Sequence, residues 1–344
     1  MKGAAAVTRK PLLTLYSVAH FWVDLSCAFL AFRFLSGSPD FLLCLLLYNF
    51  CAFALQMPLG IWADGLNRNG LLAAVGCGLT AAAFLVPLAL PAAVVAGVGN
   101  ALFHLGGGID VLNAGERKAA ALGVFVSPGA VGLYAGTLWG GGEQVSALMP
   151  LAGLLLLGGA ILGLCRRSFG SFRSGNVPVD TEPLRGSLGL LVPLFLVVML
   201  RSWMGLGQSF PWKAEWGLPL VLALAAGKAA GGFLMDAMGP RRAAAWSLGL
   251  GAALYLFSGY AVPGLMAVFL FNMTMPMTLW AAAKLLPGAK GFAFGLLTFA
   301  LFVGYLPVYL GWPGVFSQPW ACAGVAALSL ALLWRPMGKE ALRC

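Results

Sequence analysis

Long apolar segments follow one another almost without interruption, and they decide what this chain can fold into. A helix that spans the hydrocarbon core of a bilayer needs roughly 20 mostly apolar residues. Breaks at charged residues, prolines and glycines divide the sequence into twelve such segments: 11–35, 41–63, 70–90, 92–113, 119–139, 144–165, 187–206, 216–236, 243–261, 264–287, 291–311 and 314–334. We therefore predict an all-α polytopic membrane protein with twelve transmembrane helices.

The composition supports this prediction. Charged residues make up 9% of the 344 residues, whereas a soluble domain carries about 25%. A soluble enzyme, a disordered chain and a nucleic-acid-binding protein do not fit such a sequence, and we expect a lipid bilayer around it. The predicted joins are short, at 36–40, Pro91, Pro263 and 312–313, so they leave no room for a soluble domain.

The basic residues indicate an orientation. Lys and Arg gather in the cytoplasmic loops of membrane proteins. With the first residue inside, the outer loops contain only Lys213, and four basic residues fall within helices. Sixteen of the 21 basic residues then lie in the inner loops and termini: Lys2, Arg9, Lys10, Arg68, Arg117, Lys118, Arg166, Arg167, Arg173, Arg185, Arg241, Arg242, Lys290, Arg335, Lys339 and Arg343. We therefore expect a multi-pass protein of the cell (inner) membrane with both termini cytoplasmic.

The longest polar stretch divides the chain into two halves. Residues 167–186 are rich in Ser, Pro, Arg and acidic residues, and we expect them to form a cytoplasmic linker. The predicted domains are an N-terminal six-helix bundle at 1–166 and a C-terminal six-helix bundle at 187–344.

A short motif occurs once in each half. The second segment ends with Gly60 and Asp64, and the eighth ends with Gly232 and Asp236, an offset of 172 residues that equals half the chain. A glycine lets two helices approach closely, and an aspartate at a helix end can accept hydrogen bonds from the N-terminus of a neighbouring helix. Such a contact can form in one conformation and break in another, or it can merely cap a helix.

This repeat resembles the loop motif Gly-x-x-x-Asp-(Arg/Lys)-x-Gly-(Arg/Lys)-(Arg/Lys) of the major facilitator superfamily. Gly65, Asn67 and Asn69 depart from the motif in the first copy, as do Ala237 and Pro240 in the second. The resemblance implies two pseudo-symmetric six-helix bundles and alternating access to a central site, without a cofactor. It assigns gating to the residues of the two loops: Gly60, Asp64, Arg68, Gly232, Asp236, Arg241 and Arg242.

A narrower resemblance concerns the fourth and fifth segments. A glycine-rich run leads into Phe103-His104, and spaced glycines follow Pro128. Together with a His before an Asp in the first segment, this is similar to the fosmidomycin-resistance branch of the superfamily. Leu105 and the glycines after it stand where that branch has Pro and an acidic residue. The branch implies export of a phosphonate or related solute.

Three ionisable residues of the first half lie in the middle of predicted spans, where such groups are costly and usually functional. His20 and Asp24 are four residues apart, so they share one face of a helix, and His104 lies in the fourth segment. Histidine titrates near neutral pH, so this set predicts proton coupling. The alternatives are a structural polar pair for His20 and Asp24, and a packing histidine for His104.

The second half and the end of the first segment supply candidates for binding a solute. Lys228 can serve as a counter-ion of Asp24 or hold an anionic group, and Arg201 either binds a carboxylate or phosphonate or reaches the outer headgroups. Arg33 has the same two options, binding or anchoring at the interface. Asn272 and Trp280 line the tenth segment around a proline. The balance of charge favours an anionic or zwitterionic small-molecule substrate.

These features predict a monomeric secondary active transporter, a proton-coupled exporter. An importer, a facilitator and a non-transporting receptor remain open. The sequence has no Gly-x-x-x-x-Gly-Lys-Ser/Thr loop for ATP. It also lacks paired cysteines and a His-Glu-x-x-His spacing, so we expect no metal site, no cofactor and no intramembrane enzyme.

Overall fold

A computed structural model describes residues 2–115, 118–142, 144–167, 181–312, 314–338 and 342, and of 2–9, 167 and 181–186 it describes the backbone only. Helices and turns account for the described chain. Consecutive helices that continue one another form a single rod, and the predicted all-α fold with twelve such rods is confirmed. The first half contains α1 (Lys2–Leu30) with the π-helical turn η1 (Ala31–Leu35), α2 (Phe41–Asn49) with η2 (Phe50–Ala54) and α3 (Gln56–Leu66), α4 (Asn69–Ala83), α5 (Ala89–Ala114), α6 (Ala120–Val126) with α7 (Pro128–Gly141), and α8 (Leu148–Arg167). The second half contains α9 (Thr181–Gly207), α10 (Gly217–Met238), α11 (Pro240–Tyr255), α12 (Ala261–Asn272) with α13 (Thr274–Leu285), α14 (Lys290–Tyr309), the 3₁₀ turn η3 (Val315–Ser317) and α15 (Pro319–Leu333).

Within the described residues, nine helices are long and apolar enough to cross a bilayer. α4 and α15 are apolar but shorter, and α11 begins with Arg241 and Arg242 in its first turn. Several rods are interrupted at mid-length by a π-helical turn or a proline. The chain is thus a multi-pass membrane protein whose helices are not all of spanning length.

Two predicted joins are displaced, for the same physical reason. Pro91 and Pro263 are predicted to separate helices, but each is the third residue of a helix, α5 and α12 respectively. The first turn of a helix tolerates proline because its backbone N–H groups have no intrahelical partner. The joins lie instead at 84–88 and 256–260. Similarly, α9 begins at Thr181, inside the range expected to be a linker, while 168–180 lie outside the described residues.

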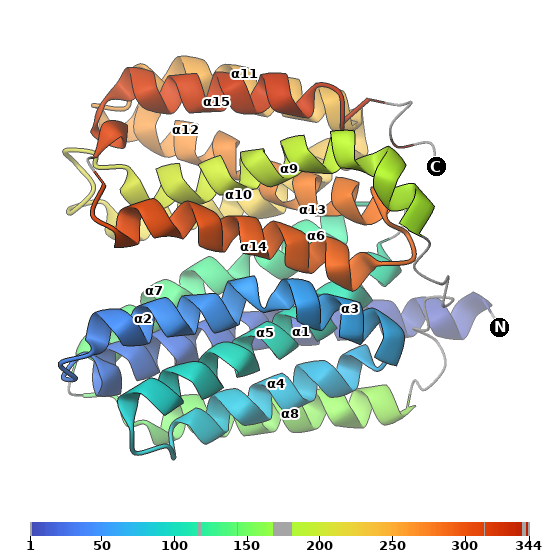
Figure 1. Cartoon of the computed structure of the whole chain (residues 1–344), viewed down its shortest axis with the longest axis vertical. Coiled ribbons are helices and arrows are strands. Elements are labelled where there is room, and N and C mark those ends of the chain that lie inside the picture. Colours follow the sequence, from blue (N-terminus) through green and yellow to red (C-terminus); the bar gives the residue numbers. More distant parts are fainter. Residues whose placement is uncertain are drawn as a thin grey trace.

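The helices form two bundles that lie side by side (Figure 1). α1 begins and α15 ends at the same end of the molecule. α6 and α14 run along the boundary, because α6 packs on α10 and α14 packs on α3. The helices of the boundary therefore join the two halves directly.

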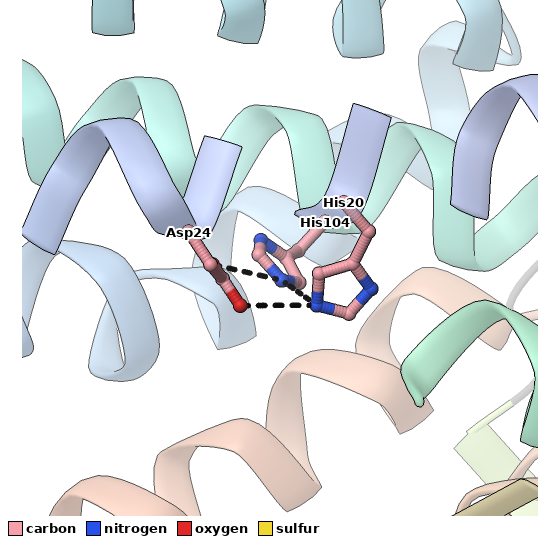
Figure 2. A group of neighbouring side chains, drawn as sticks. All are labelled: His20, Asp24 and His104. Atoms are coloured by element: carbon pink, nitrogen blue, oxygen red, sulfur yellow. Dashed lines mark hydrogen bonds and ion pairs between the residues drawn. The ribbon is translucent and has the colours of Figure 1, made fainter. Parts of the chain in front are cut away.

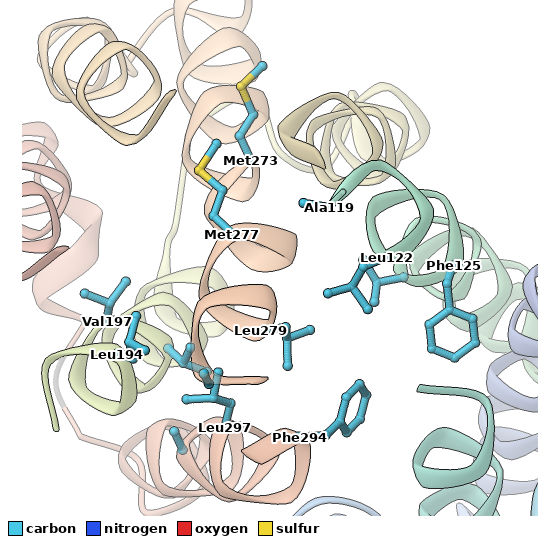
Figure 3. Close-up of a cluster of buried hydrophobic side chains, with 14 of the residues drawn as sticks. Ala119, Leu122, Phe125, Leu194, Val197, Met273, Met277, Leu279, Phe294 and Leu297 are labelled. Carbon is cyan, nitrogen blue, oxygen red and sulfur yellow. The ribbon is translucent and has the colours of Figure 1, made fainter. Parts of the chain in front are cut away.

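The apolar core continues across that boundary. Leu122 and Phe125 of α6 belong to the same buried cluster as Met277, Phe294 and Leu297 of the second half (Figure 3). This shared cluster gives the two bundles a common apolar interior.

Within the first half, α7 lies close against α1. A side chain at Gly132 or Gly136 would collide with the backbone of α1. This close approach sets the position of Gly129, at the start of α7, relative to the polar residues of α1.

Candidate functional site

The three ionisable residues predicted for proton coupling meet in space. His20 and Asp24 project from α1 and His104 from α5, and their polar ends point toward one another (Figure 2). His20 Nε2 lies 2.9 Å from His104 Nε2 and 3.2 Å from Asp24 Oδ2. His104 Nε2 lies 3.8 Å from Asp24 Oδ1. We call these three residues the His–His–Asp cluster.

Backbone carbonyls fix the protonation of both imidazole rings. His20 Nδ1 lies 2.8 Å from the carbonyl oxygen of Phe125, and His104 Nδ1 lies 2.9 Å from that of Asn100. A carbonyl can only accept a hydrogen bond, so each Nδ1 carries the proton and donates. In a neutral ring the Nε2 atom is then an acceptor. Two acceptors at 2.9 Å are compatible only if one proton lies between them, so the geometry suits a shared proton beside a carboxylate.

Two further residues support the cluster. Asn100 donates from Nδ2 to Asp24 Oδ1 at 3.1 Å, which fixes the carboxylate. Gly129 faces the cluster so closely that a Cβ there would collide with both His20 Nε2 and Asp24 Oδ2. The prediction from sequence does not include either residue. An asparagine in the middle of an apolar span is the available signal for Asn100, because buried polar side chains in a membrane are costly.

Of the two predicted cations of the second half, Lys228 lies near the cluster and Arg201 lies near Lys228. Lys228 is within range of electrostatic interaction with both Asp24 and Arg201. Arg201 is only 7% exposed and donates from Nη1 to Thr274 Oγ1 at 3.3 Å. Lys228 therefore interacts with the carboxylate of the first half and with the guanidinium of the second.

The other predicted binding residues are placed differently. Asn272 is buried and donates to the carbonyl of Val268 in its own helix. The indole Nε1 of Trp280 is buried without a partner among the described residues. Arg33 lies at the far end of the first rod, where its Nη1 donates to the carbonyl of Gly142 at 3.1 Å, and it does not join the cluster.

The repeated aspartates make matching contacts between the halves. Asp64 accepts hydrogen bonds from the backbone N–H groups of Gly291, at 2.7 Å, and Phe292, at 2.9 Å, in the first turn of α14. Asp236 accepts from those of Ala119, at 2.7 Å, and Ala120, at 3.0 Å, at the start of α6. Each carboxylate thus binds the N-terminus of a helix in the opposite half, where the helix dipole favours negative charge. We call these two contacts the aspartate latches.

The repeated glycines permit these contacts. A Cβ at Gly60 would collide with the backbone of Gly291, and one at Gly232 would collide with that of Ala119 and Ala120. Only a residue without a side chain therefore lets the helices of the two halves meet at these points.

The basic residues of the two loops do not take part in the latches. The side chains of Arg68 and Arg242 are exposed, and neither forms a hydrogen bond or an ion pair with the described residues. Arg241 binds the carbonyl and the ring of Trp334 within the second half.

A second buried acid lies apart from the cluster. Asp110 of α5 is 3% exposed and accepts hydrogen bonds from Tyr16 Oη at 2.7 Å and Asn69 Nδ2 at 2.8 Å. It lines a cavity of about 110 Å³ together with Lys10 and Tyr16. Both of its oxygens therefore have partners within the first half, which suits a structural role.

Comparison with known proteins identifies the fold. No protein-family model matches the sequence, and no curated protein is significantly similar to it. Among solved structures, the chain resembles FucP, a major facilitator superfamily transporter in the outward conformation, with a TM-score of 0.69 and 15% identity over 95% of this chain and 97% of that one. It also resembles the human organic anion transporter MFSD10 (TETRAN), with a TM-score of 0.66 and 16% identity over 94% of this chain and 99% of that one. A single-residue variant of the E. coli fucose:proton symporter FucP matches with a TM-score of 0.61 and 15% identity over 98% of this chain and 99% of that one. The chain therefore has the fold of the transporters of the major facilitator superfamily.

Proposed function

We propose that the protein is a secondary active transporter that moves a small organic solute by alternating access, coupled to protons. The observation that carries the proposal is the His–His–Asp cluster, in which both imidazoles are buried and the two facing Nε2 atoms need one proton between them. Binding and release of that proton change the charge near the boundary between the halves. The fold is consistent with this function, since one of the similar structures is a fucose:proton symporter.

The solute that we propose is anionic or zwitterionic. Lys228 is within electrostatic range of one carboxylate, Asp24, and of a second cation, the buried Arg201, so a negative group of the solute would balance that second cation. Arg201 offers a planar fork of donors suited to a carboxylate or phosphonate. MFSD10, which has the same fold, is an organic anion transporter. Asn272 and Trp280 would contact the remainder of the solute, and Arg33 would act at its entry.

The direction that we propose is export, as in the fosmidomycin-resistance branch that the sequence resembles. We place the protein in the inner membrane as a monomer, with the latches and both termini cytoplasmic. Both latches are formed, which corresponds in this proposal to a closed cytoplasmic side. Opening it would break the bonds of Asp64 and Asp236 together and separate the close contacts of Gly60 and Gly232 with the opposite half.

A transport assay with the purified chain in proteoliposomes tests the proposal, with fosmidomycin as the phosphonate probe. The wild-type protein should concentrate fosmidomycin against its gradient when a pH gradient is imposed, and reversing the pH gradient should reverse the movement. Asp24→Asn should abolish uphill movement, because the cluster loses its charge. Asp40→Asn, at an exposed acid, should leave it intact.

Each result decides a separate part of the proposal. Uphill, pH-driven movement by Asp24→Asn would contradict the role of Asp24 in coupling. Absence of fosmidomycin movement by the wild-type protein would contradict the phosphonate assignment. Movement only down the gradient would identify a facilitator.

A further inference from the structure

We propose that the His–His–Asp cluster is also a binding site for a divalent first-row transition-metal cation, with Zn²⁺ as the reference ion. The cation would take the place of the shared proton and hold the cluster in one state. This inference goes beyond transport, because the binding of a cation to the resting protein needs neither a solute nor a gradient.

The ligand atoms of the three residues lie close to the spacing that a tetrahedral cation requires. Zn²⁺ binds imidazole nitrogen and carboxylate oxygen at about 2.0–2.2 Å in tetrahedral geometry, which places the ligand atoms roughly 3.3–3.6 Å from one another. His20 Nε2 lies 2.9 Å from His104 Nε2 and 3.2 Å from Asp24 Oδ2, while His104 Nε2 lies 3.8 Å from the other carboxylate oxygen, Asp24 Oδ1. One ligand atom from each residue lies within 4.8 Å of the other two. The three measured distances lie on both sides of the required value, so small rotations of the side chains are enough.

The atoms behind the ligands are already arranged for a metal. A histidine that binds a metal almost always donates its other ring N–H to a carbonyl or carboxylate, which fixes the tautomer. His20 and His104 both donate from Nδ1 to backbone carbonyls, so both Nε2 lone pairs are directed into the cluster. Asn100 holds the carboxylate of Asp24 through its amide.

Gly129 packs directly against the ligand atoms. A Cβ at this residue would collide with the ligand atoms of both His20 and Asp24, so only a residue without a side chain fits beside them. Sites with three protein ligands and one open position bind a water molecule or a solute atom. The cluster supplies three protein ligands, so the fourth ligand of a bound cation would be a water molecule or a solute atom, as in an exchangeable metal site.

One charge opposes the cation. Lys228 is within electrostatic range of Asp24 and His104 and repels a second positive charge there. The affinity of the site for a cation then depends on Lys228, which is not a ligand. Replacement of Lys228 by a neutral residue should tighten cation binding, on the order of tenfold.

Metal binding to the full-length chain, purified without a polyhistidine tag, tests the inference. The chain contains only two histidines, and both lie in the cluster. Calorimetry with Zn²⁺ should give one site, and X-ray absorption should show two imidazole nitrogens. Co²⁺ should give the visible absorption of a tetrahedral complex.

Variants separate the ligands from their surroundings. His104→Gln and Asp24→Asn should each weaken Zn²⁺ binding by about 100-fold or more, whereas His104→Cys should retain it, since a thiolate is also a zinc ligand. Asp40→Asn is the control and should bind as the wild type does, and Lys228→Met should bind more tightly. Rescue by cysteine distinguishes loss of a ligand from loss of the fold.

Three outcomes would overturn the inference: no binding by the wild-type chain at millimolar Zn²⁺, equal binding by His104→Gln, or an absorption spectrum dominated by sulfur from the seven cysteines. None of these depends on a gradient. A failure of metal binding therefore leaves the transport proposal standing, and a failure of the transport assay leaves the metal site standing.

Discussion

An imidazole buried in a membrane is stable only where both of its ring nitrogens have partners, because an unpaired polar group there is costly. His20 satisfies this condition with Phe125 and His104, and His104 satisfies it with Asn100 and His20. The contact between the two rings is the one that needs an added proton. A single proton therefore determines whether this buried contact is attractive or repulsive.

Gly129 offers a test at the residue scale. In Gly129→Ala the new methyl group would collide with His20 and Asp24, so we expect the two rings to separate and the free energy of unfolding to fall by about 1–3 kcal/mol. Thermal unfolding in detergent measures the stability, and proteoliposome transport measures the coupling. Gly141→Ala is the control in the same helix, since nothing lies within 4 Å of a Cβ there. Unchanged coupling in Gly129→Ala would contradict the geometry of the cluster.

At this scale the sequence predicts chemistry better than contacts. The spacing of His20 and Asp24 on one helix is sufficient to predict that they meet. It does not decide whether His104 joins them, since 84 residues separate it from His20 and only the packing of α5 on α1 brings them together. For Arg33 the sequence shows that a charge lies in an apolar segment, but it does not show how far that charge lies from the cluster.

At the scale of elements, the latches combine a helix dipole with hydrogen bonds to a charged acceptor. Each carboxylate binds two N–H groups that no helical carbonyl can satisfy. Hydrogen bonds to charged groups contribute about 1.5–3 kcal/mol. Two such latches are strong enough to favour one conformation and weak enough to open.

Hydrogen–deuterium exchange tests whether the latches are gates or only helix caps. In Asp64→Asn the latched state should lose about 1–3 kcal/mol. If opening separates the halves as rigid bodies, exchange should increase at the start of α14 and also at the start of α6, where Asp236 binds. A helix cap without a gating role would raise exchange at α14 alone. The Asp40 side chain forms no cap hydrogen bond at α2, so Asp40→Asn should change exchange at neither α14 nor α6.

The number of helical rods can be predicted from the sequence because each needs its own apolar stretch, whereas their ends cannot. Pro91 and Pro263 look like breaks in a hydropathy pattern, although a proline in the first turn is compatible with a helix. The short α4 and α15 also fall below the length expected of a span. Helix ends depend on capping and packing, which a hydropathy pattern does not record.

For the whole molecule, the repeat related by 172 residues explains why two distant contacts match. A contact from α3 to α14 and one from α10 to α6 each join the first half to the second. The central residues are less symmetric, since the histidines and Asp24 belong to the first half and Lys228 and Arg201 to the second. The matched latches suit a motion common to both halves. The different residues at the centre suit separate roles, with the first half binding the proton and the second half binding the solute.

The account depends most on the shared proton, and nuclear magnetic resonance of ¹⁵N-labelled histidine measures it directly, because the chain has only two histidines. We expect both rings to carry a proton on Nδ1, and one further proton to couple the two Nε2 atoms, so that their signals change together with pH. Asp24→Asn should alter both signals. A ring that carries its proton on Nε2 and none on Nδ1 would contradict the account. Signals of the two histidines that change independently with pH would also contradict it.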